Sequence, residues 1–93
     1  MVHVNLIATF KMIAGRNSME LDLPAGKTVK DAVAAVLSKV PALRPHWLNT
    51  YGEIHAHVHI YLNGDDVNTL RDGMETTLKN NDELDFIPPV AGG

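Results

Sequence analysis

The chain has 93 residues, which is enough for one domain with a modest core but too few for a separate catalytic lobe. Its 45% apolar and 20% charged residues are ordinary for a globular domain, and a formal net charge of -3 without a cluster of Lys and Arg disfavours nucleic acid as a partner. The absence of cysteine excludes disulfides, thiolate metal sites and cysteine nucleophiles.

The apolar pattern gives no sign of a membrane or export segment. The longest uninterrupted apolar run, Ala32 to Leu37, is far shorter than the roughly 20 residues that span a bilayer. The first residues lack the basic region that opens a signal peptide. We therefore expect no membrane partner and a cytoplasmic protein.

Alternating apolar residues predict two strands at the start of the chain. From Val2 to Phe10 every second residue is apolar, and Ile7 breaks the pattern on the outer face. Residues 15–17 predict a turn, after which residues 19–23 alternate again as a second strand. We expect the two strands to pair as a hairpin.

A helix is predicted to follow. Thr28 and Asp31 have the spacing of a capping box, with Asp in the usual place of Glu or Gln. Beyond them, apolar residues recur at the spacing of one helical face: Val29, Ala32, Val33, Val36, Leu37 and Val40. Pro41 and Pro45 are expected to stop helical propagation, which leaves residues 41–56 as an irregular connection.

Two further strands complete the predicted fold. Residues 58–62 alternate up to the turn at Asn63-Gly64, residues 67–78 predict a short strand or one helical turn, and residues 84–87 alternate before Pro88-Pro89. In the last strand Phe86 is expected to face inward and Ile87 outward. This order predicts an α+β fold in which a mixed sheet packs one face on one main helix.

The end of the chain is its most distinctive segment. A domain over residues 1–89 is followed by Val90, Ala91, Gly92 and Gly93, and the proline pair favours a stiff, extended exit. Four extended residues reach on the order of 13 Å, and two glycines let the backbone pass through a narrow channel. The carboxylate of Gly93 is thus expected to reach a pocket in another protein.

The strand and helix pattern, together with Asp82-Glu83-Leu84 and the run from Phe86 to Gly93, resembles the ubiquitin-like sulfur carriers MoaD, ThiS and CysO. The resemblance covers nearly the whole chain and implies a β-grasp fold with a flexible diglycine tail. It also implies a carrier, or the small subunit of a molybdopterin-synthase-like complex, and not an enzyme. Val90, Ala91 and Gly92 would be recognised as the tail.

The resemblance implies a chemistry for Gly93. An E1-like adenylyltransferase of the MoeB/ThiF type would use ATP to adenylate it, and conversion to a thiocarboxylate would let it donate sulfur in a synthase. No cofactor would be bound by the chain itself. Activation is required because a carboxylate with a pKa near 3.5 is ionised at neutral pH and is a poor electrophile.

The pathway stays open at this point. The ending Pro-Pro-Val-Ala-Gly-Gly most resembles the molybdopterin type, whereas the stretch from Pro41 to His55 and the segment from Ile60 to Val67 resemble the cysteine-biosynthesis type.

Ile7 and Ile87 are candidate partner-binding residues. Both are apolar residues on otherwise polar faces of the first and last predicted strands. The resemblance implies that the outer sheet face and the tail dock on the activating enzyme and the synthase, and both residues fall where the family carries bulky apolar side chains.

His55, His57 and His59 are expected to share one strand face, about 7 Å apart at alternate positions. Such spacing could bring nitrogen ligands to zinc, but three residues on a straight strand do not converge as tetrahedral geometry requires. We therefore favour a solvated face and assign no metal. His3 and His46 indicate only surface positions.

Two alternatives to the carrier remain. A ubiquitin-like modifier would use the same activated carboxylate to acylate a lysine on a target protein. A non-catalytic β-grasp binding module would end in diglycine by chance.

Overall fold

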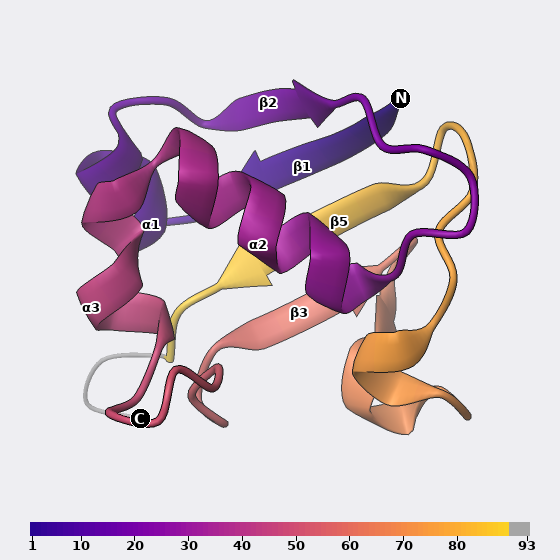
Figure 1. Ribbon diagram of the computed structural model, residues 1–93. Helices are drawn as coiled ribbons and strands as arrows, with labels where there is room; N and C mark the ends of the chain where they lie inside the picture. The colour runs from indigo at the N-terminus through magenta and orange to yellow at the C-terminus, as the bar shows by residue number, and fades with distance from the viewer. Residues whose placement is uncertain (90–93) are drawn as a thin grey trace.

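A five-stranded mixed sheet carries the helices on one of its faces in the computed structural model, which describes residues 1–89 (Figure 1). The spatial order is β2-β1-β5-β3-β4, with β1 and β5 parallel and the other neighbouring pairs antiparallel. The strands are β1 (Val2–Leu6), β2 (Ser18–Leu21), β3 (His59–Leu62), β4 (Asp65–Asp66) and β5 (Glu83–Ile87). The predicted α+β arrangement is confirmed.

The main helix, α2 (Val29–Lys39), crosses the inner face of the sheet (Figure 1). The predicted capping box is present: the Thr28 hydroxyl accepts from the Asp31 amide at 3.3 Å, and the Asp31 carboxylate accepts from the Thr28 amide at 2.9 Å. This second bond is the main cause that holds the pKa of Asp31 below its usual value. The predicted apolar stripe is buried: Val29, Ala32, Val33, Val36 and Leu37.

The inward side chains of the strands complete the core. Leu84 and Phe86 on β5 are fully buried, as the alternation predicted, whereas Asp85 and Ile87 between and after them are only half-buried. The same alternation buries Val2, Val4 and Leu6 on β1.

The first strand is shorter than predicted. It ends at Leu6, and helix α1 (Thr9–Ala14) follows, so the prediction of a strand up to Phe10 is wrong. Ala8 turns the chain with a positive φ of 52°. Phe10 is buried from the helix and makes an edge-to-face contact with Trp47, with ring centroids 5.6 Å apart. Phe10 lies two residues after the apolar Ala8, which is the spacing of a strand, and this is why the pattern predicted that the strand continues.

The first part of the connection after α2 is helical, which corrects the prediction for residues 41–47, whereas residues 48–56 are irregular as predicted. A 3-10 turn, η1 (Pro41–Leu43), leads into α3 (Arg44–Trp47), and Pro45 lies in the first turn of that helix. Proline is tolerated there because the first amides of a helix have no partner within it. Leu43 and Trp47 are fully buried, so this segment is part of the core.

Two 3-10 turns, η2 (Val67–Thr69) and η3 (Gly73–Glu75), fill the stretch for which a short strand or a helical turn was predicted. Within residues 1–89, no helix is long and apolar enough to cross a membrane.

Candidate functional site

Ile7 and Ile87 lie side by side at the end of the β1–β5 pair. The register aligns Leu6 with Phe86, and the Ile7 amide donates to the Phe86 carbonyl at 3.2 Å. The Ile7 side chain is 39% exposed and Ile87 is half-buried, with His59 as the neighbour of Ile87 on β3. The two residues are thus brought together, while their role in docking stays a prediction.

The last described residues, Pro88 and Pro89, directly follow this pair. Pro88 is buried and Pro89 is exposed. The Phe86 ring stacks on Trp47 with centroids 4.5 Å apart, and this contact packs β5 against the helix α3. The predicted tail residues Val90, Ala91, Gly92 and Gly93 lie outside the described residues.

A row of hydrogen-bonded polar side chains runs across the outer face of the sheet. The Asn5 amide group donates to Asp85 at 2.8 Å, which turns its oxygen toward His3, and His3 Nε2 donates to that oxygen at 3.0 Å. The other ring nitrogen, Nδ1, contacts the carboxylate of Glu20. The row therefore joins β2, β1 and β5.

Both ring nitrogens of His3 face oxygens that can only accept, so both must carry a proton when the row is complete. The hydrogen bond that His3 donates to the Glu20 carboxylate is the main cause that raises the pKa of His3 above 6.5. The sequence indicated only a surface position for His3. Its partners become visible only through the strand register, which places it opposite Glu20 and next to Glu83.

The histidine ladder is not formed. His59 begins β3, whereas His55 and His57 belong to the turn before it, where the Val58 amide donates to the His55 carbonyl at 3.1 Å. The rings of His55 and His57 stack with centroids 4.6 Å apart. Among residues 1–89, no group of three or more His, Cys, Asp or Glu is arranged to hold a metal ion.

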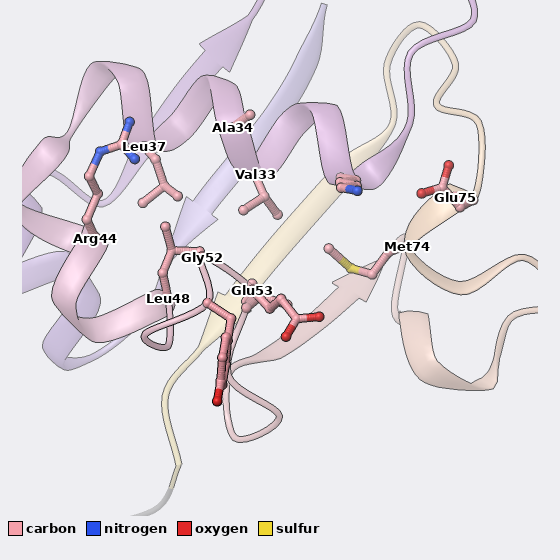
Figure 2. A pocket seen from close by; sticks show the side chains of 12 residues that line it. Val33, Ala34, Leu37, Arg44, Leu48, Gly52, Glu53, Met74 and Glu75 are labelled. Carbon is pink, nitrogen blue, oxygen red and sulfur yellow. The ribbon is translucent and has the colours of Figure 1, made fainter.

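A groove of about 640 Å³ lies on the helical side of the molecule, between α2 and the loop from Leu48 to Ile54 (Figure 2). Met74 of η3 also lines it. Its floor is apolar, and charged side chains surround it (Figure 2). No sequence pattern predicts this groove, because half of its lining residues come from residues 44–54, a segment without a readable period.

Known proteins resemble this chain in sequence and in fold. A family model described as the ThiS family matches residues 4–93. Small archaeal modifier protein 3 of Haloferax volcanii is 32% identical over 92 residues, covering 99% of this chain and 98% of the relative. The crystal structure of SAMP1 from the same organism superposes with a TM-score of 0.90 at 28% identity, covering 99% of this chain and 98% of that one.

A structure of a complex is also similar. In the BexX/CysO complex of Amycolatopsis orientalis, the matching chain has a TM-score of 0.80 at 26% identity, and each chain is covered completely. These superpositions confirm the β-grasp fold.

Proposed function

Since the chain belongs to the ThiS family of ubiquitin-like sulfur carriers, we propose that it carries sulfur as a thiocarboxylate on Gly93. The observation that carries this proposal is the extent of the family match, which begins at residue 4 and includes Gly92 and Gly93. The family consists of small carrier and ubiquitin-like proteins, which are not catalytic. The chemistry is therefore assigned to partner enzymes.

The proposed reaction has two steps. The Gly93 carboxylate attacks the α-phosphorus of ATP, which releases pyrophosphate and leaves an acyl adenylate. Hydrosulfide then attacks the acyl carbon, so a carbon–sulfur bond forms, the bond to AMP breaks, and one proton is released. In a synthase the thiocarboxylate sulfur would then bond to the acceptor, and water would cleave the acyl carbon–sulfur bond, which leaves the sulfur on the acceptor and restores the Gly93 carboxylate.

The body of the protein supports this role by fixing the base of the tail. β5 is hydrogen-bonded on both sides, by β1 and β3, and Phe86 is locked against Trp47. We propose that an E1-like adenylyltransferase of the MoeB/ThiF type docks on Ile7, Ile87 and the surrounding sheet face. A sulfur-accepting synthase would use the same face afterwards. Because activation consumes ATP, we place the protein in the cytoplasm.

The five strands contain no Lys or Arg, whereas the outward positions carry Glu20, Glu83 and Asp85. The docking surface of the activating enzyme is therefore expected to combine an apolar socket for the two isoleucines with basic residues around it.

A second function is favoured by one observation. The relative that is 32% identical over nearly the full length of both chains is named as a modifier protein. A modifier would transfer the activated Gly93 carbonyl to a lysine amine, so both functions share the adenylation step. A β-grasp binding module, the third alternative, would need no chemistry at Gly93.

The test is intact mass spectrometry of the full chain after incubation with its E1-like enzyme, ATP and hydrosulfide. We expect a gain of about 16 Da, for one oxygen replaced by sulfur, that requires all three components. The matched control is the chain with Gly93 deleted, which should show no gain. Diglycine remnants on lysines of other proteins would favour the modifier, and failure of every cognate enzyme to adenylate Gly93 would leave only the binding module.

The sulfur pathway is tested by which synthase accepts sulfur from the protein. Thiocarboxylated protein is offered to a molybdopterin-type and to a cysteine-type synthase. The proposed pathway is the one in which the mass returns to that of the carboxylate as product forms.

A further inference from the structure

The groove between α2 and the loop from Leu48 to Ile54, here called the α2 groove, has the composition of a protein interface (Figure 2). It lies on the helical side of the sheet, opposite the face that carries His3, Asn5 and Asp85. Its floor consists of apolar side chains from three segments: Val33, Leu37, Leu48, Ile54 and Met74. An apolar centre within a polar rim is typical of protein-binding surfaces.

The rim of the α2 groove carries both basic and acidic side chains. Lys30 and Arg44 come from the helices α2 and α3, whereas Glu53 and Glu75 come from the loop and η3. Within residues 1–89 the one ion pair joins His3 and Glu20. The four rim charges therefore have no ion-pair partner in the described part of the chain.

Tyr51 stands at the edge of the groove with 85% of its surface exposed. The turn that carries it is held by the Asn49 side chain, whose oxygen accepts from the amides of Tyr51 at 2.8 Å and Glu53 at 3.0 Å. Gly52 completes the turn with φ 77°. Because the turn already orders the backbone at Tyr51, binding would cost little further conformational entropy. Tyrosine is also frequent at interface hot spots.

We propose that the α2 groove binds an amphipathic helix of a partner protein, whose apolar stripe is bordered by acidic residues on one side and basic residues on the other. From Lys30 to Leu37 the helix α2 rises about 10 Å, which matches two turns of a docked helix with apolar residues at i, i+4 and i+7. The acidic border meets Lys30 and Arg44, and the basic border meets Glu53 and Glu75.

Charge selects against other helices. A helix with acidic residues on both borders meets the carboxylates of Glu53 and Glu75, and one with basic residues on both borders meets Lys30 and Arg44. The proposal does not rest on sulfur transfer, because neither Ile7 nor Ile87 lines the α2 groove. A partner in the groove would leave the outer sheet face open to a second protein.

The test uses three synthetic helical peptides of about 14 residues with the same leucine stripe. One has Glu on one border and Lys on the other, the second has Glu on both, and the third has Lys on both. Each is titrated into the isotope-labelled full chain and followed by NMR. We expect the mixed peptide to bind about 10-fold more tightly than either uniform peptide, with shifts at Val33, Leu37, Ile54 and Met74.

Charge reversal on the protein tests the geometry. The double variant Lys30→Glu with Arg44→Glu should prefer the peptide with Lys on both borders. The matched control, Lys11→Glu with Lys79→Glu, changes the net charge equally outside the groove and should keep the preference for the mixed peptide. Tyr51→Ala should weaken the mixed peptide about 10-fold. All five side chains are exposed, so the variants are expected to fold, and their spectra without peptide check this.

Three outcomes would overturn the proposal: no saturable binding of any peptide up to about 1 mM, equal binding of all three, or shifts on the outer face of β1 and β5 in place of the groove. An unchanged preference in the Lys30→Glu, Arg44→Glu variant would overturn it as well.

Discussion

Trp47 stacks on Phe86 with ring centroids 4.5 Å apart and an angle of 17° between the rings. The short helix α3 is thereby packed directly against the strand that leads to the tail. Both side chains are fully buried. The position of the tail base thus depends on a helix that is distant from it in sequence.

Replacement of Phe86 by Ala should remove this stacking and leave a cavity under β5. We expect a loss of about 3–5 kcal/mol in the free energy of unfolding, measured by urea denaturation. Phe86→Leu keeps most of the volume and should cost less. Equal losses for the two variants would show that the ring volume is not what holds the strand.

Ile7→Asp should weaken docking of the activating enzyme without unfolding the protein, because its side chain is exposed and a buried carboxylate in an interface is costly. We expect the rate of adenylation at limiting enzyme to fall about 10-fold or more. Met12→Asp is the matched control, since Met12 is 77% exposed on α1. A loss that is equal in both variants would argue against the patch of Ile7 and Ile87.

Ala8→Gly should stabilise the protein. Ala8 has φ 52° and ψ -124°, a conformation that glycine adopts readily and that costs a residue with a β-carbon free energy. Ala8 also precedes α1 without a side-chain cap, a position where glycine is better than alanine. We expect a gain of about 1 kcal/mol in thermal or urea unfolding, and Ala42→Gly, in the 3-10 turn η1, should be destabilising by comparison.

The His3 row predicts a pH dependence of stability. The pKa of His3 is raised in the folded protein, so the stabilisation is fully present below the unfolded value of 6.5 and is lost as pH rises through the higher folded value. As the pH rises from 6.5 through the folded pKa of His3, the urea midpoint of the native protein should therefore fall more than the urea midpoint of Glu20→Gln.

NMR titration of His3 checks the cause. Glu20→Gln should lower its pKa, since it removes the main partner. Asp85→Asn should lower it too, because Asn5 is then free to turn its amide group toward the ring. The control is Asp66→Asn, which should leave the pKa of His3 unchanged. Asp66 lies on the edge strand β4, where it pairs with Tyr61 of β3. An unshifted pKa in both test variants would exclude the row as the cause.

The sequence predicted those parts of the fold in which one local rule decides the structure. The capping box at Thr28 and the stripe of α2 depend only on neighbours along the chain, and both are confirmed. The alternation in β5 placed Phe86 and Ile87 on their correct faces because each strand has one buried and one outer face.

The predictions were wrong where a contact between distant parts of the chain determines the local structure. Phe10 continued the two-residue alternation, but its contact with Trp47 is made from a helix. Pro45 predicts the end of a helix, but it lies in the first turn of α3, a position that accepts proline. The α2 groove could not be predicted, because its walls come from segments that meet only in the folded protein.

The parallel pairing of β1 with β5 has a consequence for synthesis. Within residues 1–89 the central strand β5 is the last strand in chain order, so this sheet cannot close until translation has passed Ile87. A chain that is terminated early lacks the strand between β1 and β3 and cannot complete the core. The order of strands therefore makes the folded body depend on translation past Ile87.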